Sequence, residues 1–274
     1  MKKLTIILLC AFLLPSCESA DAPRRIDPEI RPTDLVLPAQ AEVEAPELPA
    51  GVLLRVMSYN IYGGQFATAE EIGRMIAEHD LDLVGLQECP DEYLAPIAAA
   101  AGFEHYAGSG VALMSKTPLV DLQELSLNSG RSFVHATSEI GGRVFSVYVA
   151  HLGWNLDGNH QCREFVDEHL AFDPLAHLVM LGDFNDEHMS LQIDILEEIL
   201  SDAFTVSGWY PGQRISWPST HFDDTEGSQL IDLIFFRRDF VPIVVEADVL
   251  NLDPVLSDHK PTTATLLYRC PQTC

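Results

Sequence analysis

One stretch near the middle of the chain, residues 177–185, constrains the fold more than any other. It is His-Leu-Val-Met-Leu-Gly-Asp-Phe-Asn. Its apolar run at residues 178–181 is typical of a short strand buried on both faces, and the glycine that follows allows the backbone to turn. Asp183 and Asn185 therefore lie at the end of this strand and point to the same side. This stretch also suits a plain turn, but a carboxylate and an amide aimed together at a sheet edge can orient a water and hold an anionic oxygen.

The first residues have the features of an export signal. Lys2 and Lys3 precede an apolar stretch, residues 4–14, that is too short to span a bilayer. Residues 14–17, Leu-Pro-Ser-Cys, resemble the lipobox of bacterial lipoproteins, although proline at its second position is atypical. We therefore expect residues 1–17 to be a signal peptide and Cys17 to carry a lipid anchor in the bacterial cell envelope. Ordinary secretion with a slightly later cleavage is the alternative.

The next segment, residues 18–50, contains six prolines, eight acids and three arginines without apolar periodicity. Such a composition buries too little apolar surface to offset the entropy of ordering, so it predicts a disordered acidic tether. Residues 51–274 remain, enough for one domain with a sizeable core.

This domain is strongly acidic. It carries 33 of the acidic and 11 of the basic residues, a formal charge near −22. Tight, sequence-independent binding to duplex DNA usually draws on clustered lysines and arginines, and beyond Arg237-Arg238 no such cluster is visible. The charge argues against a processive nuclease without excluding one.

Four cysteines follow the signal, namely Cys89, Cys162, Cys270 and Cys274. In an exported chain they allow disulfides in three pairings that the sequence does not rank. Cys270 and Cys274 could close a small loop, and free buried thiols are the alternative for Cys89 and Cys162.

Strands outnumber helices in the expected order of elements, and several hairpins are local, as at Gly141-Gly142. A capping box of Thr68 and Glu71 begins the first helix. This pattern predicts an α/β sandwich of mainly antiparallel strands with helices outside. We expect strands at 53–59, 81–87, 110–114, 119–127, 132–140, 143–150, 178–181, 230–236, 241–249 and 262–268, and further helices at 93–101, 160–172 and 191–200.

Polar side chains recur where these strands end. Each has a structural explanation of its own, such as a turn residue or a helix cap, but eight of them in such positions indicate a shared site at one edge of the fold. Asp232 interrupts an apolar strand, and the others lie at strand ends or in the loops that follow: Asn60, Glu88, His151, Asp183, Asn185, Asp258 and His259.

The segments around these residues resemble, in order, the signature of the endonuclease/exonuclease/phosphatase superfamily. The superfamily includes deoxyribonuclease I, bacterial sphingomyelinases and inositol polyphosphate phosphatases. The resemblance covers residues 53–268 and implies a four-layer α/β sandwich with two mainly antiparallel sheets and helices outside. The matching segments are Ser58-Tyr59-Asn60, Leu86-Gln87-Glu88, Ala150-His151-Leu152-Gly153, Gly182-Asp183-Phe184-Asn185, Ile231-Asp232 and Ser257-Asp258-His259.

The resemblance also implies a metal site. Glu88 would be the principal ligand, with Asn60 and Asp258 alongside. These are hard oxygen donors that suit Mg²⁺, and Mn²⁺ is possible.

The remaining residues would perform the chemistry. Asp183 would orient and deprotonate the attacking water, and Asn185 would hold that water or a phosphate oxygen. His259, positioned by Asp232, would bind or protonate the phosphate. His151 would donate to a phosphoryl oxygen or to the leaving group, and its position generally holds a tyrosine in the apurinic-site endonucleases of the superfamily.

We therefore expect an exported, metal-dependent, monomeric phosphoesterase that cleaves phosphodiester or phosphomonoester bonds by water attack. Its substrate would be a small molecule, a lipid headgroup or a nucleic acid. A nuclease acting on DNA or RNA and a non-catalytic tethered binding module are the alternatives. The membrane-inserting aromatic hairpin of secreted sphingomyelinases is not evident. Candidates for further substrate contacts are Arg131, Arg163, Arg214, Trp209, Tyr210 and Trp217, each with a surface or packing role as the alternative.

Overall fold

The computed structural model describes residues 50–208, 216 and 229–269. Several sequence predictions fall on residues outside these ranges and stay predictions: the signal peptide, the tether up to residue 49, and Cys17, Trp209, Tyr210, Arg214, Trp217, Cys270 and Cys274. Within the described ranges, no helix is both long and apolar enough to cross a membrane.

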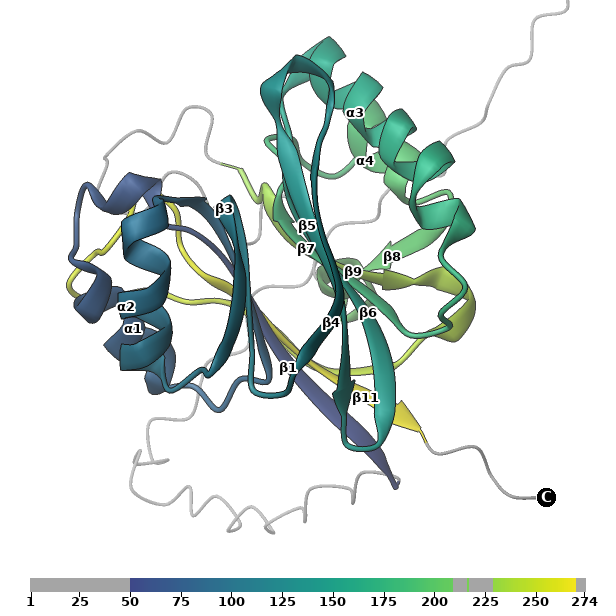
Figure 1. Cartoon of the computed structure of the whole chain (residues 1–274). Coiled ribbons are helices and arrows are strands. Elements are labelled where there is room, and N and C mark those ends of the chain that lie inside the picture. Colours follow the sequence, from purple (N-terminus) through teal and green to yellow (C-terminus); the bar gives the residue numbers. More distant parts are fainter. Residues whose placement is uncertain (1–49, 209–215, 217–228, 270–274) are drawn as a thin grey trace, which may run out of the picture. The chain divides into compact units, whose positions relative to one another are not determined.

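The described strands form two sheets that lie face to face (Figure 1). The first has the strand order β10-β11-β1-β2-β3, and the second has the order β4-β5-β6-β7-β9-β8. Only β1–β2 and β6–β7 are parallel among the described pairs, which confirms the prediction of mainly antiparallel sheets. The strands are β1 Gly51–Asn60, β2 Leu83–Cys89, β3 His105–Ser115, β4 Leu119–Ser126, β5 Ser132–Ile140, β6 Arg143–His151, β7 Leu178–Asp183, β8 Leu200–Asp202, β9 Asp232–Arg237, β10 Ile243–Val249 and β11 Thr262–Arg269.

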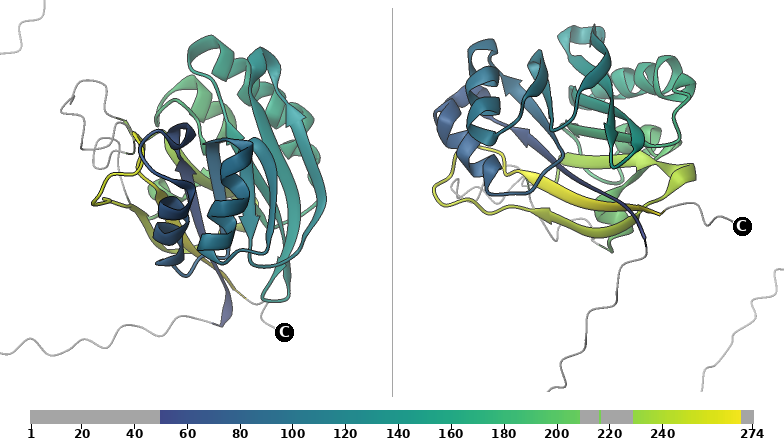
Figure 2. Two further views of the ribbon diagram at one scale, coloured as in Figure 1. Left: turned by 60° about the vertical axis from the view of Figure 1, so that its left-hand side comes forward. Right: turned by 60° about the horizontal axis from the view of Figure 1, so that its bottom comes forward.

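Helices cover the outer faces of both sheets (Figures 1 and 2), so the fold is the expected four-layer sandwich. α1 (Ala69–Ala77) and α2 (Asp91–Ala101) pack on the first sheet, and α3 (Asn155–Glu168) and α4 (Leu191–Leu196) lie against the second. A short helix, α5 (Ala203–Val206), follows β8.

The alternation of side chains along β1 shows how this layering arises. Leu54 and Val56 belong to the core between the sheets, whereas Met57 and Tyr59 belong to the core beneath α1 and α2. Because neighbouring side chains in a strand point to opposite faces, one apolar strand supplies both cores.

Local signals explain where the first helices begin and end. The Thr68 hydroxyl accepts a hydrogen bond from the Glu71 backbone N–H at 3.3 Å, and the Glu71 carboxylate accepts one from the Thr68 N–H at 2.9 Å, so the predicted capping box is present. α2 ends at Gly102, whose positive φ of 76° suits glycine.

Two element predictions were wrong around α3 and α4. α3 begins at Asn155 instead of residue 160, because tertiary packing stabilises its first residues, which include the poor helix formers Gly158 and Asn159. The helix predicted to end at residue 200 stops at Leu196, and β8 then pairs with β9. The sequence could not show this pairing, because it joins residues that are far apart in the chain.

Cys89 and Cys162 are free and buried, which decides between the alternatives for these two residues. Burial raises the pKa of both thiols, that of Cys89 to about 12. Neither thiol is therefore a reactive thiolate at neutral pH.

Gly85 lies on β2 where the two sheets meet. A methyl group at this position would lie 2.9 Å from a Val149 methyl on β6 and 3.0 Å from the Leu181 Cβ on β7. The close approach of the sheets therefore requires a residue without a side chain.

We expect Gly85→Ala to lower the free energy of unfolding by about 1–3 kcal/mol, because the added methyl overpacks the core between the sheets. Chemical denaturation measures the change, and Ser126→Ala on the exposed part of β4 is the control. Equal unfolding midpoints for wild type and Gly85→Ala would contradict this account of the sheet packing.

Candidate active site

The strand register brings three of the predicted residues side by side. His151 is the last residue of β6 and Asp183 the last of β7, and these two strands are parallel neighbours in which His151 pairs with Asp183. Asp232, the first residue of β9, pairs with Asp183 from the other side. A polar row at one edge of the second sheet follows directly from these pairings.

Asp183 lies at the centre of this row and is almost completely buried. Its Oδ2 accepts a hydrogen bond from Asn60 Nδ2 at 2.9 Å, and its Oδ1 accepts one from the Asn185 backbone N–H at 2.9 Å. His151 Nε2 lies 3.4 Å from the same Oδ2. Burial and the nearby Asp232 carboxylate raise the pKa of Asp183.

His259 forms an ion pair with Asp232. Its Nδ1 lies 2.9 Å from Asp232 Oδ2, and its Nε2 lies 3.8 Å from Asp183 Oδ2. Burial opposes the charged imidazolium, but the Asp232 and Asp183 carboxylates outweigh burial and raise the pKa of His259 to about 9. The site therefore holds a buried cation at neutral pH.

Two serines that were assigned no role hold the segments around this pair. Ser257 Oγ donates to the Asn60 carbonyl at 2.7 Å and accepts the His259 backbone N–H at 3.2 Å. Ser216 Oγ accepts the backbone N–H groups of Ile231 and Asp232, both at 3.1 Å. Ser257 lies within a recognisable segment of the sequence, whereas nothing in the sequence around Ser216 indicates its contact.

Asn60 connects two carboxylates. Its Nδ2 donates to Glu88 Oε1 at 3.2 Å as well as to Asp183, and its Oδ1 accepts the Tyr62 backbone N–H at 3.0 Å. The side-chain oxygen expected to bind metal is thus engaged by the backbone.

Glu88 is re-aimed by an irregularity in its strand. The register between β2 and β3 shifts between Gln87 and Cys89, and Glu88 has a positive φ of 52°. Such a bulge breaks the strict alternation of side chains, which allows Glu88 to reach the pocket.

His151 differs electrostatically from His259. Arg131 Nη1 lies 2.8 and 3.0 Å from its two ring nitrogens, and Asn185 Nδ2 lies 3.2 Å from its Nε2. Burial, together with the Arg131 charge and against the opposing effect of Asp183, lowers the pKa of His151 to about 4. One histidine of the site is therefore neutral and the other charged over a wide pH range, as expected for groups with different roles.

These groups surround a pocket of about 210 Å³. Six of the eight predicted residues line it, while Asn60 and Asp232 lie behind its wall. The carboxylate of Asp258, the remaining predicted ligand, has its Oδ1 3.3 Å from the Ser257 hydroxyl oxygen. The lining consists of Glu88, Arg131, His151, Trp154, Asp183, Asn185, Gln229, Ile231, Asp258 and His259.

Among the arginines that the sequence analysis named, Arg131 lines this pocket. Arg163 instead forms an exposed pair with Glu198, with nitrogen–oxygen distances of 2.6 and 2.8 Å, and does not line it. Trp154, which is 64% exposed at the pocket, was not identified from the sequence.

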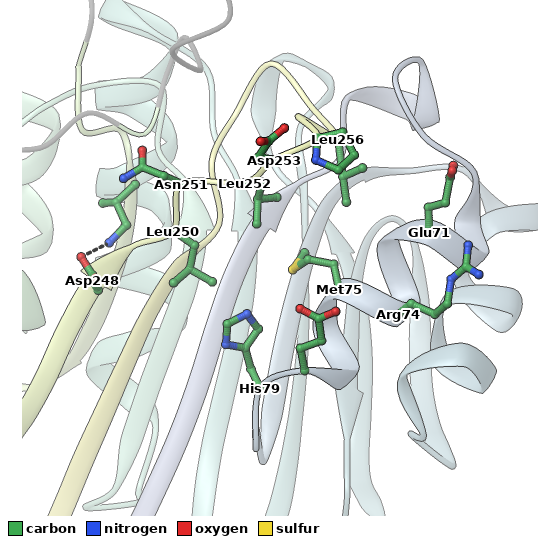
Figure 3. A pocket seen from close by; sticks show the side chains of 13 residues that line it. Glu71, Arg74, Met75, His79, Asp248, Leu250, Asn251, Leu252, Asp253 and Leu256 are labelled. Carbon is green, nitrogen blue, oxygen red and sulfur yellow. Dashed lines mark hydrogen bonds between the residues drawn. The ribbon is translucent and has the colours of Figure 1, made fainter.

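A larger pocket of about 700 Å³ lies between α1 and the segment 248–256 (Figure 3). Its lining includes Arg74 and His79 on one side and Leu252 and Asp253 on the other, and none of the eight predicted residues lines it. The smaller pocket is the candidate active site because the titratable groups with perturbed pKa values converge there.

The donor set suits a hard divalent cation. The carboxylates of Glu88 and Asp258 both line the pocket, and oxygen ligands of this kind are preferred by Mg²⁺. The ligand atoms of Asp183, Asp232 and His259 also lie within 4.8 Å of one another. The His259 imidazolium has no free lone pair with which to bind a metal. Glu88 and Asp258 therefore suit a cation better than the cluster of Asp183, Asp232 and His259 does.

A layered α/β sandwich with carboxylates and histidines at one edge of its sheets defines the class of structure. The sequence model of the Endonuclease/Exonuclease/phosphatase family matches residues 57–259, and the chain belongs to that family. A search of curated protein sequences found no match to the chain.

Solved structures of low sequence identity share the fold. An endonuclease/exonuclease/phosphatase from Bacteroides vulgatus has 17% identity and a TM-score of 0.69, with 79% of this chain and 99% of that chain covered. A mannosyl-6-phosphatase from Bacteroides thetaiotaomicron has 18% identity and a TM-score of 0.64, with 78% of this chain and 100% of that chain covered. TDP2 from D. rerio, complexed with a single-strand DNA product, has 16% identity and a TM-score of 0.63, with 78% of this chain and 98% of that chain covered.

We expect Asp232→Asn to lower the pKa of His259 from about 9 toward its ordinary value of 6.5 or below, because the main partner of the imidazolium loses its charge. NMR titration of the histidine ring signals, without added metal, measures this.

The matched control is Asp202→Asn. His188 Nε2 lies 3.2 Å from Asp202 Oδ2, and this carboxylate outweighs burial to raise the pKa of His188. The control should lower the pKa of His188 and leave that of His259 in place. An unchanged pKa of His259 in Asp232→Asn would show that the ion pair does not set its charge.

Proposed function

We propose that this chain is an exported, divalent-metal-dependent phosphoesterase that hydrolyses its substrate by attack of water. The main support is the buried Asp183 carboxylate, flanked by the His259 cation and the neutral His151 at a pocket of about 210 Å³. The family includes phosphoester hydrolases, which supports the reaction class.

Each side chain has a role in this proposal. Glu88 and Asp258 would hold the metal ion, which when bound would neutralise phosphate charge as a Lewis acid. The His259 imidazolium donates a hydrogen bond to a phosphoryl oxygen. Asp183 orients the water and accepts its proton, and a raised pKa improves a carboxylate as a base at neutral pH.

The groups on the other side of the pocket position the ester. The Asn185 side-chain amide donates a hydrogen bond to the Leu152 carbonyl at 2.9 Å. This contact holds Asn185 beside the place where the phosphate would bind. The Arg131 guanidinium supplies a second cation beside His151, and His151 contacts the phosphoryl or leaving-group oxygen. Most of the rate enhancement would come from these fixed charges and donors.

A small-molecule or lipid-headgroup phosphoester is the favoured substrate class. The pocket is small, and a domain charge near −22 opposes close approach of a polyanion. A nuclease is the second candidate, because the exposed Trp154 ring at the pocket can stack on a base.

We expect the purified domain, residues 51–274, to hydrolyse bis-p-nitrophenyl phosphate, p-nitrophenyl phosphate or plasmid DNA when Mg²⁺ is present. Asp183→Asn should lower kcat by about 10²–10⁴-fold, because it removes the base. His259→Gln should lower kcat by about 10²–10³-fold, because it removes a donor to the developing charge. The preferred substrate separates a diesterase, a monoesterase and a nuclease.

Removal of the metal, together with a substitution of Glu88, tests the proposed metal site. EDTA should abolish hydrolysis, and Glu88→Gln should weaken its dependence on Mg²⁺, whereas Glu124→Gln on the exposed β4 should leave both unchanged. Hydrolysis that is indifferent to EDTA and to Glu88→Gln would overturn the metal role. Absence of hydrolysis of a broad panel of phosphoesters would favour the tethered binding module.

The cellular location is a separate proposal, supported by the basic and apolar start of the chain. Mass spectrometry of the mature protein should find a lipidated Cys17 as its first residue, and Cys17→Ser should move the protein from the membrane fraction to the soluble fraction. An unmodified Cys17, or a mature chain that begins after it, would show secretion without a lipid anchor.

A further inference from the structure

Three separate loops bring Arg131, His151 and Asn185 to the pocket. Arg131 follows the single turn Asn128–Gly130, His151 ends β6 just before the connection to α3, and Asn185 lies in the connection from β7 to α4. These residues contact one another, so their function depends on how the three loops are held together.

Gln161, fully buried on α3, joins two of these loops. Its Oε1 accepts the Gly153 backbone N–H at 2.7 Å, and its Nε2 donates to the Asn128 carbonyl at 2.7 Å. Gly153 lies two residues after His151, and Asn128 lies three residues before Arg131. One carboxamide therefore connects the two backbone segments through both of its ends.

Gln192, fully buried on α4, connects the loop of Asn185 to Gly153. Its Nε2 donates to the Gly153 carbonyl at 3.1 Å and also to the Phe184 carbonyl, next to Asn185. Both backbone polar groups of Gly153 are thus bound by glutamines from two different helices.

Gly158 allows the helices to approach this closely. A methyl group at Gly158 would lie 1.9 Å from Gln192 Oε1 and 2.3 Å from the Gly153 carbonyl oxygen. The contact of α3 with Gly153 and Gln192 therefore requires glycine at this position, although glycine weakens a helix interior.

We propose that Gln161 and Gln192 are positioning residues that hold the loops of Arg131, His151 and Asn185 in register around the pocket. This proposal rests on the proposed function and identifies which residues outside the pocket support it. A carboxamide is required because Gln161 donates with one end and accepts with the other. An ionised carboxylate at this position can accept but cannot donate.

The chemistry of Gln161→Glu gives a direct test. A neutral glutamic acid has the shape of glutamine and restores the donor to the Asn128 carbonyl, whereas the ionised form places two oxygens against each other. Burial and the facing carbonyl favour the neutral form, so this form persists above the ordinary range of a glutamate. The variant should therefore lose activity as the pH rises.

The experiment measures kcat of Gln161→Glu relative to wild type on bis-p-nitrophenyl phosphate from about pH 5.5 to about pH 9. We expect a ratio near one at the acidic end and a fall of about 10–100-fold at the alkaline end, because small displacements of positioned groups reduce kcat strongly. Gln161→Met should show a similar loss at every pH. The control Gln123→Glu, on the exposed part of β4, should match wild type throughout.

A ratio for Gln161→Glu that does not change with pH would overturn the proposal, whether it is near one or uniformly low. A purely structural role would lower the melting temperature without a pH-dependent loss of kcat in the folded enzyme. Circular dichroism at the assay temperature establishes that each variant is folded.

An NMR measurement separates this proposal from the proposed function. In the ligand-free domain, Gln161→Met should shift the His151 ring signals and the Asn185 side-chain amide signals, whereas Gln123→Met should not. If wild type hydrolyses none of the esters, the proposed function fails and this measurement still tests the loop register. Unchanged His151 and Asn185 signals would overturn the role of Gln161.

Discussion

A carboxylate buried as deeply as Asp183 must be compensated, and the rest of the site is arranged around that constraint. Asn60 and the Asn185 backbone donate hydrogen bonds to it, and His259 places a positive charge 3.8 Å away. An uncompensated buried charge would destabilise the fold by several kcal/mol. The groups that compensate the buried Asp183 charge also lie at the pocket. The same residues are therefore needed for the stability of the fold and for the proposed chemistry.

The two histidines illustrate how their surroundings assign different charge states to one residue type. His259 lies between two carboxylates and stays charged, whereas burial, with Arg131 alongside, keeps His151 neutral. The pocket is lined by two cations, His259, 3.8 Å from the Asp183 carboxylate, and Arg131, which contacts His151. A phosphate between them would be contacted by both positive charges while the carboxylate remains available to a water.

The sequence was sufficient to predict most strand ends and therefore which polar residues meet at the candidate site. Apolar runs such as residues 178–181 become central strands, and the polar residue after each run is carried to the same edge. The sequence left a turn role open for polar residues at strand ends, and Asn60 has one, because its oxygen accepts the Tyr62 backbone N–H. The bulge at Glu88 and the contacts of Gln161 and Gln192 depend on residues far apart in the chain, and no local pattern indicates them.

The acidic composition is compatible with the proposed anionic substrate class because surface charges and pocket charges act over different distances. Exposed acids around the domain are screened by salt over about 8 Å at physiological ionic strength, so they affect mainly the encounter with long polyanions. Inside the pocket, His259 and Arg131 lie next to the bound group in a region of low dielectric, where each charge acts more strongly. A short phosphoester would interact with these local cations once bound, whereas an extended duplex would also contact the acidic surface. A charge distribution that would discourage a duplex is therefore compatible with the chemistry proposed at the pocket.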